Sequence, residues 1–190
     1  MSLHTAEPAT SPVDARAMLA SAELLFSADQ VNAAISRVAV EVTQRLADKD
    51  PLVLCVMTGG VVFCGQLLPQ LPFPLDFDYL HATRYSQDNA GGALSWRAAP
   101  WKNVKGRSVL VVDDILDEGA TLAAVRERLL QMGALEVLIA VLADKAHGRA
   151  KPITADFVGL TVPDRFVFGC GMDAHGVWRN LPAIYALQGA

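Results

Sequence analysis

The sequence predicts an α/β fold, in which a parallel sheet is covered by helices on both faces. Three runs of strand length are wholly apolar: Leu52–Met57, Val109–Val112 and Val137–Ala143. Uninterrupted apolar strands are typical of sheets buried on both sides, whereas a half-exposed strand alternates. Segments with helical patterns separate these runs, as a parallel sheet requires. With 190 residues, 52% of them hydrophobic, the chain suits one well-cored domain.

The N-terminal third is expected to be mainly helical. Residues 1–12 form a loose tail, and a first helix covers Val13–Phe26. Ser27 with Gln30 three residues later is a capping box, which predicts a second helix over about Ala28–Ala47. Its apolar side chains recur at helical spacing, at Val31, Ile35, Val38 and Val42.

The middle of the chain predicts a glycine turn and a ribbon. The first apolar run ends in Thr58-Gly59-Gly60, followed by a short helix over Val61–Leu68. Leu75–Thr83 alternates in part and is expected to be a strand, with Leu94–Ala98 as a returning arm. The polar segment Tyr85–Gly92 between them predicts a mobile loop.

The remaining elements follow the second apolar run. A helix is expected from about Gly119 to Met132, with Gly133 as its C-terminal stop. After the third run, Asp156–Leu160 and Phe166–Phe168 are shorter apolar pieces near the end.

Composition excludes several classes of protein. A net charge of -4 argues against nonspecific nucleic-acid binding, which needs a surplus of basic side chains. No apolar run approaches the roughly 20 residues that span a bilayer, and the N-terminus lacks the features of a secretory signal. Cys55, Cys64 and Cys170 are isolated among apolar neighbours, which predicts inert thiols and no zinc site. We therefore expect a soluble cytoplasmic protein that binds neither membranes nor nucleic acid.

An acidic segment between a strand and a helix predicts a ribose 5-phosphate site. Asp113 and Asp114 follow the second apolar run, where two carboxylates can accept hydrogen bonds from sugar hydroxyls or bind Mg2+. The helix that starts near Gly119 offers unpaired N–H groups to an anion, and Thr121 adds a hydroxyl. For Asp117 alone, simple capping of that helix is the plainer explanation.

These motifs resemble those of a known family. Val109–Thr121 (VLVVDDILDEGAT) is similar to the signature of type I phosphoribosyltransferases. Asp156–Asp173 and Arg179–Pro182 resemble the hypoxanthine–guanine branch, and the likeness spans roughly residues 25–185. The resemblance implies a single domain over 1–190, with a small hood built from about 13–27 and 150–190. It also implies transfer of 5-phosphoribosyl from phosphoribosyl pyrophosphate to a purine, with Mg2+ as cofactor.

The resemblance also implies roles for individual residues. The carboxylates of Asp113 and Asp114 would hold the ribose hydroxyls, and Asp117 would be the general base. The 5-phosphate would lie on Asp117, Glu118, Gly119, Ala120 and Thr121. Glu118 stands where Ser or Thr is commoner in the family, so its side chain is expected to point away from the phosphate.

Pyrophosphate and purine contacts come from other segments of the family pattern. The pyrophosphate contacts would be Thr58, Gly59, Gly60, Arg179, Arg84 and Tyr85, the last two in a lid over about 84–92. The purine contacts would be Lys145, Phe166, Val167 and Asp173. Arg149 would be an additional phosphate contact. The Mg2+ ligands would be Asp173, Asp113 and Asp114.

Two other functions stay open at this point. A xanthine-preferring transferase would differ only in a few contacts to the purine ring. A nonenzymatic regulator could keep the pocket as a sensor of phosphoribosyl pyrophosphate. Family members commonly form homodimers or homotetramers, so we expect self-association.

Overall fold

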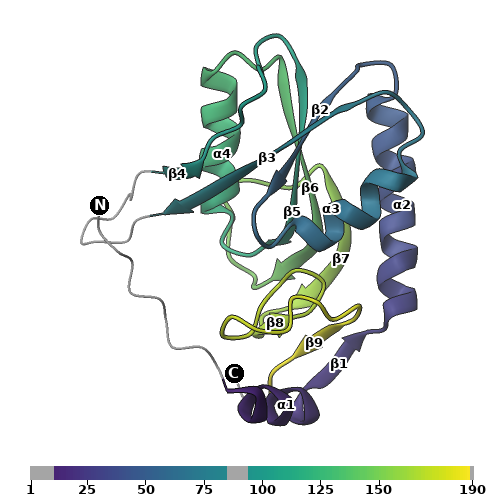
Figure 1. The fold of residues 1–190 in the computed structure, drawn as a ribbon, viewed down its shortest axis with the longest axis vertical. Coiled ribbons are helices and arrows are strands. Elements are labelled where there is room, and N and C mark those ends of the chain that lie inside the picture. The colour runs from purple at the N-terminus through teal and green to yellow at the C-terminus, as the bar shows by residue number, and fades with distance from the viewer. Residues whose placement is uncertain (1–10, 85–93, 189–190) are drawn as a thin grey trace.

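A six-stranded sheet forms the centre of the protein, whose computed structural model describes residues 11–84 and 94–188 (Figure 1). The strand order is β4-β3-β2-β5-β6-β7. Neighbouring strands run parallel except β4, which is antiparallel to β3 at the edge. The strands are β2 (Leu52–Val56), β3 (Asp76–Arg84), β4 (Leu94–Ala98), β5 (Ser108–Leu116), β6 (Glu136–Ala146) and β7 (Phe157–Pro163). The predicted α/β class is confirmed, with one antiparallel edge strand.

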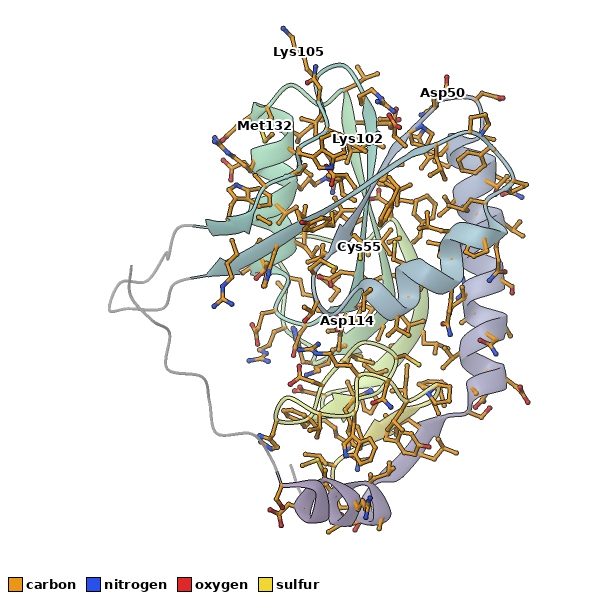
Figure 2. All side chains as sticks on the ribbon, in the orientation of Figure 1. Asp50, Cys55, Lys102, Lys105, Asp114 and Met132 are labelled. Carbon is orange, nitrogen blue, oxygen red and sulfur yellow. The ribbon has the colours of Figure 1, made fainter. Side chains whose placement is uncertain are left out.

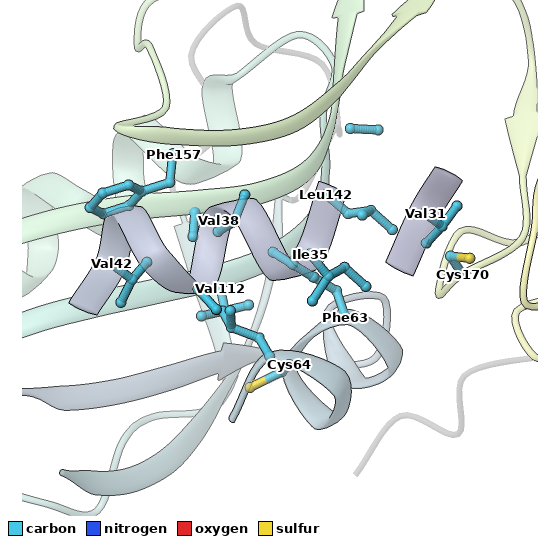
Figure 3. Close-up of a cluster of buried hydrophobic side chains, with 14 of the residues drawn as sticks. Val31, Ile35, Val38, Val42, Phe63, Cys64, Val112, Leu142, Phe157 and Cys170 are labelled. Carbon is cyan, nitrogen blue, oxygen red and sulfur yellow. The ribbon is translucent and has the colours of Figure 1, made fainter. Parts of the chain in front are cut away.

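Helices cover both faces of this sheet. The helices α2 (Ala28–Leu46) and α3 (Val61–Leu67), the latter followed by the short 3-10 helix η1 (Leu68–Gln70), pack on one face. The helix α4 (Ala120–Gln131) packs on the other. Within β2, Val53 and Cys55 join the first core and Leu52 and Leu54 join the second. Figure 3 shows the first core, between α2 and the strands. Both faces of β2, β5 and β6 are buried along most of their length, which explains the three uninterrupted apolar runs.

A second, three-stranded antiparallel sheet joins the two ends of the chain. Its order is β1 (Glu23–Phe26), β9 (Ile184–Ala186), β8 (Val167–Phe168). Figure 1 shows it below the carboxyl ends of the main strands, beside α1 (Pro12–Ser21). The assignment of one domain with a hood stays a prediction.

Two expected boundaries differ most from the structure. The helix predicted over Val13–Phe26 ends at Ser21, because Leu24–Phe26 pairs with β9, a partner that local sequence cannot reveal. The strand predicted to end at Val112 runs to Leu116, since β6 offers ladder partners up to Asp144. Asp113 and Asp114 therefore lie within β5 and not in a turn.

Helix ends agree more closely with the sequence. The capping box of Ser27 and Gln30 is confirmed, with Ser27 Oγ accepting from the amide of Gln30 and the Gln30 side chain accepting from the amide of Ser27. Gly133 follows α4 with a left-handed φ of 94°. No helix among residues 11–84 and 94–188 is long and apolar enough to cross a membrane. The expected tail lies almost wholly, and the expected loop 85–92 entirely, outside the described residues.

Candidate active site

A pocket of about 480 Å3 opens at the carboxyl ends of the parallel strands. The turn after β2, the end of β5, the first turn of α4 and Arg179 form its walls. Figure 2 shows Asp114 at this end of the sheet and Lys105 at the opposite end. The lining residues are Val56, Met57, Thr58, Gly59, His81, Ala82, Asp113, Asp114, Ile115, Leu116, Asp117, Glu118, Gly119, Ala120, Thr121, Leu122 and Arg179. Ligands of open α/β sheets bind at this edge, where loops from neighbouring strands diverge.

The N-terminus of α4 faces this pocket without a side-chain cap. Ser11 and Ser27 cap α1 and α2 through their hydroxyls, whereas Gly119 precedes α4 in a left-handed conformation (φ 78°). No described side chain accepts a hydrogen bond as a cap for α4. The first amides of this helix are therefore available to an anion, which the helix dipole also favours.

Two adjacent carboxylates lie beside that helix start. Asp114 is buried and Asp113 half-buried, and their carboxylates accept from the amides of Ile115 (2.7 Å) and Asp114 (2.9 Å). Burial, and then the charge of Asp114, raise the pKa of Asp113 well above its ordinary value. Burial also raises the pKa of Asp114. A desolvated acidic pair of this kind is stabilised by hydroxyl donors or by a cation.

Glycines allow the turn after β2 to approach the acidic pair. A Cβ on Gly59 would lie 2.2 Å from Oδ2 of Asp114, and one on Gly60 would lie 2.6 Å from the carbonyl oxygen of Val112. Gly171 closes the contact from the C-terminal segment, since its Cβ would lie 2.1 Å from the carbonyl oxygen of Gly59. Any side chain at these positions would displace the pocket wall.

Comparison with known proteins decides the family. The phosphoribosyl transferase domain model matches residues 23–175. The chain is 35% identical over 166 residues to a hypoxanthine-guanine-xanthine phosphoribosyltransferase of Tritrichomonas foetus, covering 87% of this chain and 91% of that protein. The chain belongs to the phosphoribosyltransferase family.

Other relatives agree with the hypoxanthine–guanine branch. A hypoxanthine-guanine phosphoribosyltransferase of Bacillus subtilis is 32% identical over 169 residues, which are 88% of this chain and 94% of that protein. A crystal structure of a hypoxanthine phosphoribosyltransferase from Staphylococcus aureus superposes with a TM-score of 0.85 at 25% identity, covering 90% of this chain and 95% of that one. This likeness confirms the family fold that the signature motifs implied.

The structure brings most of the expected phosphoribosyl-binding residues of this family member together. The segment from Asp113 to Thr121, Thr58 and Gly59 line one pocket, and Gly60 directly follows in the same turn. Lys145 joins them through its ammonium, whose Nζ lies 2.6 Å from Oδ2 of Asp117. The pair links the end of β6 to the turn between β5 and α4.

Arg179 connects the pocket wall to the C-terminal segment. Its guanidinium donates to the carbonyl oxygen of Gly171 at 2.6 Å and forms an ion pair with Asp173. The carboxylate of Asp173 also accepts from the amide of Gly176 at 2.8 Å. Asp173 thus orients Arg179 toward the pocket without lining it.

Two expected purine contacts lie apart from the pocket wall. Phe166 is 39% exposed and stacks on His175, with ring centroids 5.7 Å apart. Val167 is buried in β8. Neither residue lines the pocket that holds the acidic pair.

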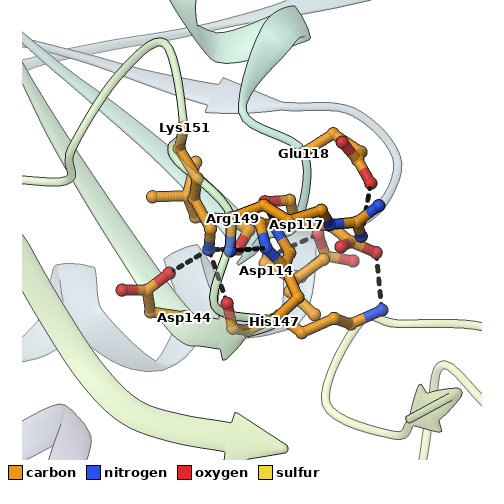
Figure 4. Close-up of polar contacts among 10 residues, drawn as sticks. Asp114, Asp117, Glu118, Asp144, His147, Arg149 and Lys151 are labelled. Atoms are coloured by element: carbon orange, nitrogen blue, oxygen red, sulfur yellow. Dashed lines mark hydrogen bonds and ion pairs between the residues drawn. The ribbon is translucent and has the colours of Figure 1, made fainter. Parts of the chain in front are cut away.

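The turn between β5 and α4 carries an ion pair on its outer side. The carboxylate of Glu118, whose side chain is 68% exposed, pairs with Arg149 at 3.0 Å (Figure 4). Among the described residues, Asp117, Glu118 and His147 bring three possible metal-ligand atoms within 4.8 Å of one another. This group differs from the predicted ligands Asp113, Asp114 and Asp173.

The acidic pair is the better fit to Mg2+. Asp113 and Asp114 are desolvated carboxylates with raised pKa values, a state that a divalent cation relieves. Asp173 already has Arg179 and an amide as partners. Asp117 is likewise paired, with Lys145.

Sequence reasoning missed two histidines. His81 lines the pocket from β3, and the Nε2 atom of His147 lies 3.2 Å from the carbonyl oxygen of Asp117. His147 falls in the polar segment 144–149 at the end of a buried strand, which was the available signal. The side chain of Arg84 and the whole of Tyr85 lie outside the described residues.

Proposed function

We propose that the protein is a purine salvage phosphoribosyltransferase. It would transfer 5-phosphoribosyl from phosphoribosyl pyrophosphate to hypoxanthine or guanine, giving IMP or GMP and pyrophosphate. One observation carries the proposal: an uncapped helix N-terminus and a desolvated carboxylate pair share one pocket. Together they suit the phosphate and the hydroxyls of one ribose 5-phosphate. The purine specificity rests on the names of the relatives.

Binding of the donor would use three parts of the pocket. The first amides of α4, with the hydroxyl of Thr121, would hold the 5-phosphate. Asp113 and Asp114 would accept from the ribose hydroxyls. The turn Thr58-Gly59-Gly60 and Arg179 would hold the pyrophosphate, because glycine lets backbone amides approach a diphosphate closely. The sugar would therefore be fixed at both ends before the purine reacts.

The transfer step exchanges one bond for another. A ring nitrogen of the purine forms a bond to C1 of the ribose, the bond from C1 to the pyrophosphate oxygen breaks, and pyrophosphate leaves with the electron pair. The proton of the purine passes to the carboxylate of Asp117. Lys145, whose ammonium lies 2.6 Å from that carboxylate, would donate to the exocyclic oxygen of the purine. Phe166 would stack on the ring, Val167 would contact its edge through the backbone, and Asp173 would keep Arg179 aimed at the leaving group.

We also propose that Mg2+ is the cofactor. Asp113 and Asp114 are its best-fitting residues, since they are the desolvated carboxylates beside the pocket. When bound, the ion would neutralise charge on the pyrophosphate. Loss of activity in EDTA, and its recovery when Mg2+ is added, would support Mg2+ as the cofactor.

Activity with three bases tests the proposal. The protein is incubated with phosphoribosyl pyrophosphate, Mg2+ and either hypoxanthine, guanine or xanthine, and the nucleotide is separated by anion-exchange chromatography. Hypoxanthine and guanine are expected to give monophosphates. A preference for xanthine would replace the base assignment. No product from any base, together with binding of the donor, would favour the nonenzymatic sensor and contradict the proposal.

We propose that the protein forms a homodimer or homotetramer. Phe77 and Tyr79 on β3 are 45% and 46% exposed, and Val61 on α3 is 45% exposed. The register pairs Phe77 with Val53 and Tyr79 with Cys55, so both rings lie on the face that α3 covers only in part. Exposed apolar groups gathered in this way are typical of protein interfaces. Light scattering with size-exclusion chromatography tests this, and a monomeric mass contradicts it.

We propose that the protein is cytoplasmic. The thiols of Cys55, Cys64 and Cys170 are free and buried, as expected in a reducing compartment. Fractionation of the source cells would test this.

A further inference from the structure

The side chain of Lys151 crosses between the two strand ends that carry the site. Its side chain is only 13% exposed. The ammonium donates to the carbonyl oxygen of Leu116 at 2.7 Å, to the carbonyl oxygen of Lys145 at 2.7 Å and to Oδ1 of Asp144 at 2.5 Å. Lysine has three N–H donors, so this ammonium is fully used. Figure 4 shows Lys151 and Asp144 on one side of this polar network and Glu118 on the other.

Two of these acceptors adjoin the residues proposed to handle the purine. Leu116 is the last residue of β5 and directly precedes Asp117. The second carbonyl group belongs to Lys145 itself, which directly follows Asp144, the last residue of β6 that pairs with β5. We infer that Lys151 is a positioning residue, which holds the backbone on both sides of the Asp117–Lys145 pair. This inference rests on the proposed function for its catalytic consequence.

A second side chain from the segment between β6 and β7, His147, contacts the turn between β5 and α4. The Nδ1 atom of His147 accepts from the amide of Arg149 at 3.1 Å, so the ring proton lies on Nε2. That nitrogen is 3.2 Å from the carbonyl oxygen of Asp117, to which it donates. The segment between β6 and β7 thus contacts the end of β5 at Leu116 through Lys151, and the following residue, Asp117, through His147. Two contacts one residue apart fix the direction in which the Asp117 side chain leaves the backbone.

The geometry distinguishes positioning from a general contribution to stability. The ion pair with Asp144 would be enough to balance the charge of Lys151. Two of its three hydrogen bonds nevertheless go to backbone carbonyl groups, those of Leu116 and Lys145. Its loss would remove the link between the carbonyl groups of Leu116 and Lys145, at the end of the ladder between β5 and β6, while leaving both core clusters intact. Asp117 and Lys145 would then sample more arrangements, and a displacement near 1 Å can lower a rate about 10²-fold.

Substitution of Lys151 by methionine tests the inference. Lys151→Met keeps most of the length of the side chain and removes its donors, whereas Lys151→Arg keeps charge and donors. Lys49→Met is the matched control, because Lys49 also donates to a carboxylate, Glu136, at 2.6 Å but at the other end of β6. Each variant is measured for kcat, for KM of phosphoribosyl pyrophosphate and for amide hydrogen exchange without substrate. Lys151→Gln, a milder change, replaces the methionine variant if the latter does not fold.

We expect Lys151→Met to lower kcat by about 10- to 100-fold. Amide exchange should become faster at 116–121 and 145–149 and stay unchanged in α2 and β2. Lys151→Arg should recover most of the lost activity, and Lys49→Met should keep wild-type kcat. Wild-type kcat and exchange in Lys151→Met would overturn the inference, as would faster exchange throughout the protein. Failure of the proposed function would be distinguishable, because the wild-type protein itself would be inactive. The amide-exchange result would still test whether Lys151 holds the backbone at Leu116 and Lys145.

Discussion

Replacing Gly171 with alanine tests the contact between the C-terminal segment and the turn Thr58-Gly59-Gly60, which we propose to hold pyrophosphate. Gly171 has a φ of +105°, and its Cβ would lie 2.1 Å from the carbonyl oxygen and 3.1 Å from the carbonyl carbon of Gly59. Ordinary van der Waals contact begins near 3.4 Å. The carbonyl oxygen of Gly59 must therefore move by about 1.3 Å, the difference between 3.4 and 2.1 Å. It cannot retreat freely, because the Cα of Gly59 faces the carboxylate of Asp114.

Two costs add in this variant. A left-handed backbone costs an alanine about 1–2 kcal/mol, and overpacking costs about 1–3 kcal/mol more. For a protein of this size each kcal/mol lowers Tm by roughly 2–4 °C. We therefore expect Gly171→Ala to lower Tm by about 4–20 °C. The displaced turn should lower kcat/KM for phosphoribosyl pyrophosphate by about 10²-fold.

Gly106→Ala is the matched control. Gly106 also has a positive φ, +73°, but a Cβ there meets nothing within 4 Å. Only the backbone cost applies, so Tm should fall by about 2–8 °C with kcat/KM unchanged. The assay pairs thermal unfolding with initial rates over a range of donor concentrations. Equal Tm values for the two variants, with full activity in Gly171→Ala, would refute the steric reasoning.

Three further predictions concern single side chains. Asp117→Asn should lower kcat by about 10²–10⁴-fold with little change in KM, and equal losses in both would indicate a structural role instead. The pKa of Glu136 lies below its ordinary 4.5, because its carboxylate accepts from Lys49 and Ser108 and lies near Arg45. The ionised carboxylate therefore stabilises the fold fully above pH 4.5, and this contribution is lost as the pH falls through the lower pKa of the folded state. Glu136→Gln should thus cost about 1 kcal/mol at pH 7 and nothing near pH 2 in denaturant titrations; a cost that persists in acid would contradict this. Burial raises the pKa of Cys170 to about 11, so iodoacetamide at pH 8 should label this thiol only after unfolding, as mass spectrometry can check.

Much of the main sheet follows from local sequence. Burial on both faces makes a strand apolar at every position, so β2, β5 and β6 were evident without any knowledge of their partners. The start of α2 was equally clear, because its cap is made by residues three positions apart. The acidic pair and the uncapped start of α4 are also neighbours in the chain, so their chemistry could be inferred together.

Other features depend on partners far away in the sequence. Leu24–Phe26 has a helical neighbour before it and pairs with β9 about 160 residues later, so no window of local sequence distinguishes strand from helix there. The Lys151 ammonium and the His147 ring were equally hidden, since a lone polar residue in a loop gives no sign of its acceptors.

The amino-acid order by itself determined which segments enter the core, where helices begin and which residues carry the carboxylates. These properties depend on periodicity and on contacts between near neighbours. Only the tertiary structure decided that Gly171 touches Gly59, that Arg179 faces the acidic pair and that Lys151 joins two strand ends. The physical reason is that such contacts form between chain segments brought together by burial of the sheet, and their partners are fixed by geometry and not by spacing.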